Sequence, residues 1–289
     1  MQKKNKRKFH PFVHQVVGVL SISLLTAFPV QAEEGLGKPI LVIGASLENS
    51  VTPIDDNLIG PWGGYAVNSG SYLSLGEALV RTKELNGFVI NQAEAGATSF
   101  ARLRCGWYGC MTLGWQGYDV QFQKALSRVA ITNPQNPAQI VGYNADYIFI
   151  GFPNDCLHSG AMGIPQSQTA PCTVSELNDV IDRLKTVAEN ALALGITPIF
   201  DTIPQYNVLD LPYFRQRSNL IWAISEEDLD TYRDLHRTRI QNEIPEALLV
   251  DTWEGMENID GIHPTPESAE RAAKRVAKAI RDHEKGNRH

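Results

Sequence analysis

Residues 39–50, "PILVIGASLENS", place a run of large aliphatic side chains directly before a turn of small and polar residues. The run 39–44 does not alternate between apolar and polar positions, which is typical of a strand buried on both faces of a sheet. Ser46 follows just beyond this run. The segment therefore predicts a parallel strand covered by helices, with a serine at its carboxyl end.

Four more apolar runs are predicted as strands: 88–92, 145–151, 197–204 and 247–253. Helical patterns separate the five runs, beginning with the segment 72–86. The later helices begin at recognisable capping signals: Thr173 with Glu176, Ser225 with Asp228, and Thr265 with Pro266.

Strand–helix alternation of this kind predicts an α/β protein, a three-layer α/β/α sandwich around a mainly parallel five-stranded sheet. No internal repeat, low-complexity segment or linker divides residues 33–289, so we predict a single domain there. Ligands of such sheets bind beyond the carboxyl ends of the strands. The less regular stretches 47–71 and 97–137 are expected to be loops that cover this edge.

Residues 1–32 have the layout of a secretory signal peptide: a basic start, an interrupted apolar run and small residues before two glutamates. Cleavage near Ala32 would yield an exported protein, either periplasmic or secreted. The alternative is an uncleaved N-terminal anchor, although the apolar run is short for a membrane span. We predict no stable membrane span in the mature form and expect a monomer.

The full chain has a formal net charge of −6. Loss of residues 1–32 removes five basic side chains and no acidic one, which leaves 21 basic against 32 acidic side chains and a net charge of −11. This balance argues against nucleic acid and anionic lipid surfaces as partners. It does not discriminate among enzymatic activities.

Four cysteines lie in two pairs that are close in sequence. In an exported protein they are candidates for disulfides, and of the three possible pairings we favour Cys105 with Cys110 and Cys156 with Cys172. A zinc site is the competing use of these thiols. Because the spacings are irregular and His158 is the only imidazole near them, we predict no metal.

The predicted strand ends carry a distinctive set of chemical groups. Ser46 follows the first strand, Gly96 the second, Asn154 the third, and Asp260 and His263 the fifth. Ester hydrolysis needs a hydroxyl nucleophile, an imidazole base, and a carboxylate that fixes the tautomer of the imidazole. The oxyanion of the tetrahedral intermediate needs donors, which the backbone N–H groups of Ser46 and Gly96 and the Asn154 amide can supply.

Four sequence blocks, "VIGASLENS", "NQAEAGATS", "IGFPNDC" and "IDGIHPTPES", resemble in order those of the SGNH, or GDSL-type, serine hydrolases. Together they span nearly all of the chain after residue 32. The resemblance implies Ser46 as nucleophile, His263 as base and Asp260 as the acid that orients the base. It also implies Gly96 and Asn154 as oxyanion donors, a flavodoxin-like sandwich, and no metal or organic cofactor.

Two positions depart from the family pattern. The first block usually carries Asp before the serine, where this chain has Ala45, so the support of the turn is in question rather than the attack. In the third block Phe152 and Pro153 stand between Gly151 and Asn154, so this loop needs a different path to present the amide. A loop that failed to present it would cost about two to three orders of magnitude in rate.

The segment 104–119 gathers aromatic residues around the predicted Cys105–Cys110 bond. A functional interpretation makes Trp107, Tyr108 and Trp115 a wall beside Ser46 for an acyl chain or a sugar, with Trp62 and Tyr65 as further members. A structural interpretation makes the same residues a satellite core beneath a long loop. The sequence leaves both interpretations open.

Other polar residues have ordinary structural interpretations. Ser46 alone would be taken as a helix N-cap, and Asn154 and Asp155 as turn residues. The four blocks together favour catalytic roles for Ser46 and Asn154, whereas Asp155 is interpreted as a turn residue. His158 and His236 are expected to be surface or core residues.

The sequence thus predicts an exported serine esterase or lipase that hydrolyses carboxylic esters through an acyl-enzyme on Ser46. A lipid, a lysophospholipid or an O-acetylated glycan would be the substrate. One alternative is an O-acyltransferase that uses the same three side chains. The other is a non-catalytic envelope binding protein that kept the fold.

Overall fold

The computed structural model describes residues 39–49, 74–82, 85, 88–106, 109–158, 169–217 and 222–286, with the backbone alone over 103–106 and 109–114. The predicted signal peptide lies outside these residues, as do Trp62, Tyr65, Trp107 and Tyr108. The expectations for them therefore stay predictions.

Five strands form one parallel sheet in the order β2-β1-β7-β8-β9. They are β1 (Ile40–Ile43), β2 (Val89–Asn91), β7 (Tyr147–Ile150), β8 (Thr197–Asp201) and β9 (Leu248–Val250). Each strand lies within one of the five predicted apolar runs. The central strands β1 and β7 are buried along their whole length, because helices cover both faces of the sheet. The predicted α/β class and its five-stranded parallel sheet are confirmed.

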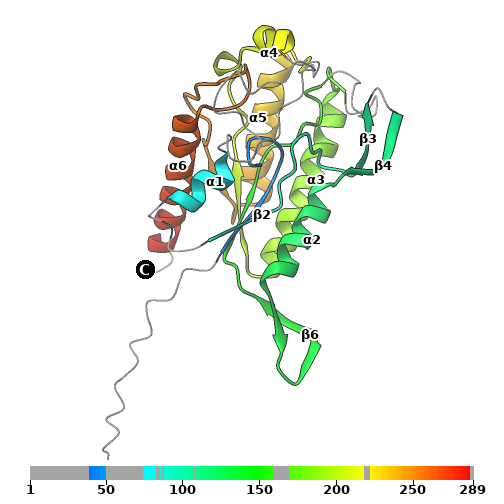
Figure 1. Cartoon of the computed structure of the whole chain (residues 1–289). Coiled ribbons are helices and arrows are strands. Elements are labelled where there is room, and N and C mark those ends of the chain that lie inside the picture. The colour runs from blue at the N-terminus through cyan, green and yellow to red at the C-terminus, as the bar shows by residue number, and fades with distance from the viewer. Residues whose placement is uncertain are drawn as a thin grey trace, which may run out of the picture. The chain divides into compact units, whose positions relative to one another are not determined.

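Helices form the two outer layers of the sandwich. They are α1 (Leu75–Arg81), α2 (Tyr118–Val129), α3 (Val174–Ala193), α4 (Leu211–Arg217), α5 (Glu226–Glu243) and α6 (Pro266–Gly286). Helices α1 and α6 pack against each other on one face of the sheet, and α3 lies between α2 and α5 on the other (Figure 1). A short 3₁₀ helix, η4 (Tyr206–Val208), precedes α4.

The predicted helix starts are confirmed by their caps. Thr173 and Glu176 form a complete capping box at the start of α3. The Ser225 hydroxyl accepts a hydrogen bond from the backbone N–H of Asp228 in α5. Thr265 likewise caps the first turn of α6 with its hydroxyl. Each cap satisfies backbone N–H groups that have no partner inside the helix.

The expectation that residues 97–137 form a loop was wrong. This stretch holds the antiparallel pair β3 (Arg102–Gly106) and β4 (Gly109–Trp115), then α2, and then β5 (Ala130–Asn133), which pairs with β6 (Asn136–Tyr143). The buried face of α2 includes a glutamine, Gln121, and this polar residue interrupts the apolar pattern that would have indicated a helix.

Candidate active site

The loops that follow β1, β2, β7 and β9 meet around one cavity at the carboxyl edge of the sheet. Ser46, Gly96, Asn154 and His263 all line this cavity, whose volume is about 150 Å³. Its other lining residues are Ala95, Trp115, His158, Phe214, Trp222 and Ile262. Parallel strands end at the same edge, so residues far apart in the chain come together there.

Three of the predicted side chains form a continuous hydrogen-bonded series. The Oγ atom of Ser46 lies 2.8 Å from Nε2 of His263, and Nδ1 of His263 lies 2.6 Å from Oδ2 of Asp260. Asp260 and His263 are buried, whereas Ser46 is partly exposed to the cavity. This order of groups places a base beside a hydroxyl and an acid behind the base.

The carboxylate of Asp260 also holds its own loop. Its Oδ1 accepts hydrogen bonds from the backbone N–H groups of Ile262, at 3.1 Å, and His263, at 2.8 Å. Burial acts to raise the pKa of Asp260, but the charge of His263 and these hydrogen bonds outweigh burial, so the pKa is lowered. The carboxylate is therefore ionised at neutral pH and favours the tautomer with a proton on Nδ1. That tautomer leaves Nε2 able to accept the proton of Ser46.

Gly261 allows this loop to dock closely on α4. Its φ is +105°, and a Cβ added there would lie 2.3 Å from the carbonyl oxygen of Asp210. The backbone N–H of Asp210 donates to the Gly261 carbonyl at 2.7 Å. Phe214 on α4 then packs edge-on against the His263 ring, at a centroid distance of 6.4 Å. The imidazole is thus fixed from two sides.

Gly96 is held in place by two large side chains. Its φ is +80°, and a Cβ added there would lie 2.9 Å from Nε1 of Trp115. The Trp115 indole donates to the carbonyl of Ala95 at 2.6 Å. The Arg102 guanidinium stacks 3.9 Å from the centroid of the Trp115 ring and donates to the carbonyl of Gly96. Trp115 therefore both supports this turn and lines the cavity, so the functional and structural interpretations of its role are compatible.

Asn154 reaches the cavity despite the two residues that separate it from Gly151. Its backbone N–H and its side-chain amide both donate to the carbonyl of Ala97, at 3.1 and 2.9 Å. These bonds tie the loop after β7 to the loop after β2. The path that Phe152 and Pro153 impose thus still places Asn154 in the cavity wall.

Asp155 also connects the loop after β7 to the loop after β2. Its carboxylate accepts from the Ser99 N–H at 2.7 Å and from the Ser99 hydroxyl at 2.6 Å, and it pairs with Arg183 of α3 at 3.2 Å. Burial raises the pKa of Asp155, against the lowering effect of these partners. Asp155 is thus a structural clamp between two loops, which is more than the turn residue that we predicted.

The predicted bond between Cys156 and Cys172 is present in the structure. Cys156 has a φ of +63° and directly follows Asp155, so the bond anchors the chain two residues beyond Asn154. Cys105 and Cys110 lie opposite each other across the β3–β4 pair. Their backbone register suits a bond, and that bond stays a prediction.

His158 contributes to the cavity wall, which sequence analysis did not predict. Its Nε2 lies 3.1 Å from Oδ1 of Asn154, and the Trp222 indole N–H approaches the same nitrogen at 3.1 Å. The histidine thus lies between Asn154 and Trp222, another lining residue. The short-range pattern "NDCLH" gave no sign of this contact. His236, by contrast, is a buried core residue, as expected.

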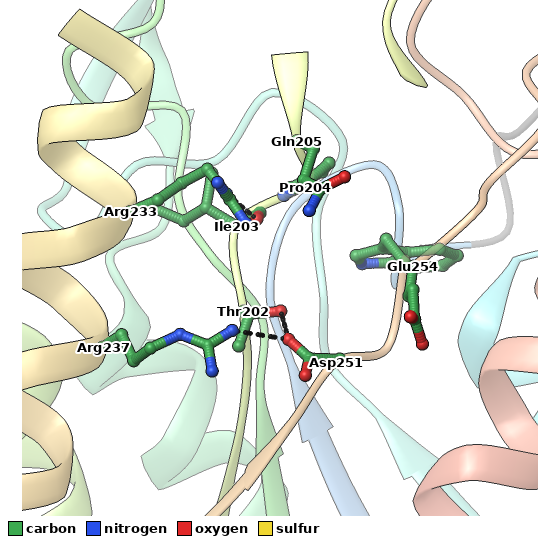
Figure 2. A pocket seen from close by; sticks show the side chains of 9 residues that line it. Thr202, Ile203, Pro204, Gln205, Arg233, Arg237, Asp251 and Glu254 are labelled. Carbon is green, nitrogen blue, oxygen red and sulfur yellow. Dashed lines mark hydrogen bonds and ion pairs between the residues drawn. The ribbon is translucent and has the colours of Figure 1, made fainter. Parts of the chain in front are cut away.

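A second cavity, of about 110 Å³, lies at the ends of β8 and β9. Figure 2 shows Thr202 and Arg237 both directed at the carboxylate of Asp251, at 2.8 and 2.7 Å. Arg233 donates to the carbonyl of Ile203 instead. Both guanidinium groups belong to α5 and therefore tie this helix to the chain just beyond β8 and β9. No histidine is among the described residues that line this cavity.

Within the described residues, no group of three or more His, Cys, Asp or Glu side chains is arranged to hold a metal ion. None of the helices in the same part of the chain has both the length and the apolar character needed to cross a membrane.

Solved structures of proteins described as esterases share the overall fold of this chain, so the predicted α/β sandwich is confirmed. One is a carbohydrate acetylesterase family member from Sinorhizobium meliloti, with a TM-score of 0.54 and 13% sequence identity over 84% of this chain and 97% of that chain. Another is the carbohydrate acetylesterase Est24 from the same organism, with a TM-score of 0.53 and 12% identity over 85% of this chain and 99% of that chain. A third is a putative arylesterase from Agrobacterium tumefaciens, with a TM-score of 0.52 and 12% identity over 85% of this chain and 99% of that chain. Neither a protein-family model nor a curated protein matches the chain.

Proposed function

We propose that this protein is an exported serine esterase that cleaves carboxylic esters through an acyl-enzyme on Ser46. The hydrogen-bonded series from Ser46 through His263 to Asp260, which opens onto a cavity, carries the proposal. The Cys156–Cys172 bond supports export, because disulfides persist in oxidising compartments. The fold supports the proposal without deciding it, because one fold can serve many activities.

In the first half-reaction, Nε2 of His263 takes the hydroxyl proton while Oγ of Ser46 attacks the ester carbonyl. The ionised Asp260 stabilises the imidazolium that forms. Collapse of the tetrahedral intermediate breaks the bond to the alkoxy oxygen, and the imidazolium returns its proton to that oxygen. An alcohol leaves, and the acyl group stays on Ser46.

Water completes the cycle by the same route. His263 takes a proton from water, whose oxygen attacks the acyl-enzyme, and then returns the proton to Oγ as the acid leaves. In both halves the negative oxygen needs hydrogen-bond donors. We assign this role to the backbone N–H groups of Ser46 and Gly96 and to the Asn154 amide, each of which belongs to a residue on the cavity wall.

The cavity favours a short acyl group. Its wall is mainly apolar, with Ala95, Trp115, Phe214, Trp222 and Ile262 beside the catalytic groups, and its volume is about 150 Å³. An acetyl or similarly short chain fits this space better than a long fatty acid does. The two Sinorhizobium proteins of the same fold carry the name carbohydrate acetylesterase, which agrees with an O-acetylated glycan as the substrate class.

Purified mature protein should be assayed with p-nitrophenyl esters of two to sixteen acyl carbons, alongside a Ser46→Ala variant. We expect the highest kcat/KM for the shortest esters and release of acetate from an acetylated oligosaccharide. A fluorophosphonate probe should label Ser46 in the wild type alone. Equal rates for the two proteins, or an unlabelled wild type, would contradict the proposed function.

A further inference from the structure

A buried glutamate lies directly beneath the turn that carries Ser46. Glu48 is fully buried, and its Oε2 accepts a hydrogen bond from the backbone N–H of Ala45 at 2.9 Å. Ala45 immediately precedes the proposed nucleophile. The carboxyl group thus holds the backbone next to Ser46, at the turn where the family pattern has an aspartate and this chain does not.

Two glycines leave the space that this carboxyl group occupies. A Cβ added to Gly44 would lie 2.4 Å from Oε2 of Glu48, and one added to Gly151 would lie 2.3 Å from its Cδ. Gly44 follows β1 and Gly151 follows β7, so the carboxyl group fits between neighbouring strand ends. Gln121 fixes Gly44 by accepting from its N–H at 2.8 Å and donating to its carbonyl at 3.1 Å. The site is therefore shaped around one side chain.

A second buried carboxyl group, that of Asp201 at the end of β8, lies near Glu48. Its Oδ2 accepts from the Trp253 indole at 3.0 Å. Within the described residues, neither Oδ1 of Asp201 nor Oε1 of Glu48 has a hydrogen-bond partner. Burial raises the pKa of Glu48 to about 8, and burial together with the charge of Glu48 raises that of Asp201. The pair of carboxyl groups therefore keeps at least one proton at neutral pH.

The neighbouring ionisable groups do not favour ionisation of this carboxyl pair. Tyr118 on α2 and Tyr232 on α5 are buried phenols whose pKa values burial raises. Asp155 is already paired with Arg183. No lysine or histidine of the described residues is among the largest influences on the pKa values of Glu48, Asp201 and Tyr118.

We infer that Glu48 is a positioning residue for the proposed esterase: through the N–H of Ala45 it holds the turn that aims Ser46 at His263. It supplies from position 48 the carboxyl group that position 45 lacks. The inference rests on the proposed function, and it makes the nucleophile turn dependent on a protonated pair of carboxyl groups. Ionisation of Glu48 would place an uncompensated negative charge beside the buried carboxyl group of Asp201 and displace the turn.

Glu48→Leu removes the acceptor, whereas Glu48→Gln keeps an acceptor oxygen and abolishes the titration. With both variants folded by circular dichroism, we expect Glu48→Leu to lower kcat for p-nitrophenyl acetate by about 10- to 100-fold with little change in KM, as for a nucleophile misplaced by up to about 1 Å. Glu48→Gln should restore kcat to within about threefold, because its amide oxygen still accepts the Ala45 N–H. Glu246→Leu, at an exposed position, is the matched control.

The pH profile is the readout that a merely structural role would not change. We expect kcat of the wild type to fall above about pH 8, whereas Glu48→Gln keeps its kcat there. Amide exchange at Ala45 should also be faster in Glu48→Leu than in the wild type.

Wild-type kcat in a folded Glu48→Leu would overturn the inference and leave the esterase assignment intact. If Glu48→Leu does not fold, superimposable pH profiles of the wild type and Glu48→Gln would overturn it. A wild type without activity and without probe labelling would instead overturn the proposed function, and the inference with it.

Discussion

The Oγ of Ser46 and the Nε2 of His263 lie 2.8 Å apart, although 217 positions separate them in the sequence. In the sheet, β7 and β8 stand between β1, which Ser46 follows, and β9, which His263 follows. The loop after β9 is held by the segment that precedes and begins α4: Asn258 donates to the Val208 carbonyl, and Asp210 donates to the carbonyl of Gly261. This docking positions the imidazole at the end of β1.

Ser46→Ala should abolish esterase activity while leaving the fold intact. Loss of the hydroxyl removes the attacking atom, and loss of a triad nucleophile costs about 10⁴- to 10⁶-fold in kcat. The partly exposed position of Ser46 predicts little change in Tm. Steady-state kinetics and a thermal melt measure both effects. Ser127→Ala, an exposed hydroxyl on α2, is the control and should match the wild type.

Asp260→Asn should lower kcat by about 10⁴-fold with KM nearly unchanged, because an amide at this position favours the wrong tautomer of His263. The variant keeps the size of the side chain, and one amide atom can still accept from the N–H groups of Ile262 and His263. Substrate binding should therefore survive. A variant that keeps more than about a tenth of wild-type kcat would show that Asp260 does not control the base.

The strands and helix starts were predictable because each depends on local sequence. Solid aliphatic runs such as 39–44 and 145–151 identify buried parallel strands, and the Thr173–Glu176 capping box marks a helix start. The strand ends in turn indicated where Ser46 and His263 lie, since a parallel sheet brings those ends to one edge.

The rest could not be predicted because it depends on long-range contacts. Gln121 interrupts the apolar pattern of the buried face of α2, so this helix was not predicted. Its role is to bond both the N–H and the carbonyl of Gly44, which lies 77 positions away in the sequence. The carboxyl group of Glu48 looks like an ordinary exposed acid in the sequence, and the space made for it by Gly151 is visible only in three dimensions. His158 acquires its contact with Asn154 from the fold of a disulfide-anchored loop.

Removal of the Cys156–Cys172 bond should lower activity and stability together. The bond closes a loop of 16 residues, and in the chain-entropy model such a loop contributes about 3 kcal/mol. A Cys156→Ala/Cys172→Ala double variant should therefore melt roughly 6 to 12 °C lower. Its kcat should fall because the loop that carries Asn154 loses its anchor. Reduction of the wild type should lower turnover before it unfolds the protein, and unchanged turnover after complete reduction would contradict this prediction.

As the pH rises from about 4.5 to about 8, the free energy of unfolding of the wild type should fall relative to that of Glu48→Gln. In this range the folded protein keeps the proton of Glu48, whose pKa burial raises to about 8, whereas the unfolded chain has lost it above about pH 4.5. The folded state then binds more protons, so a rise in pH favours unfolding until the folded pKa is passed.

Thermal melts of both proteins at pH 5 and pH 8 measure this effect, and each kcal/mol corresponds to about 2 to 4 °C in Tm. Other buried groups, such as His236 with its pKa lowered to about 4 by burial, titrate in both proteins and cancel in the difference. Glu246→Gln should follow the wild type. Parallel Tm curves for the wild type and Glu48→Gln would contradict the assignment of a proton to this buried pair.

Gly96→Ala should damage both the fold and the oxyanion site. A residue with a Cβ at a φ of +80° costs about 1 to 2 kcal/mol, and this Cβ would lie only 2.9 Å from Nε1 of Trp115. Relief of the contact would shift the turn that presents the Gly96 N–H, so kcat should fall by about 10- to 100-fold.

Gly142→Ala provides the matched comparison, because a Cβ at that position on β6 would meet no atom within 4 Å. It should leave Tm and kcat close to the wild-type values. If the two glycine variants showed equal kcat, the turn at Gly96 would have no part in stabilising the oxyanion. If Gly96→Ala alone lowers activity, and does so through kcat rather than KM, the Gly96 N–H stabilises the transition state. Loss of an interaction made equally with substrate and transition state would raise KM instead.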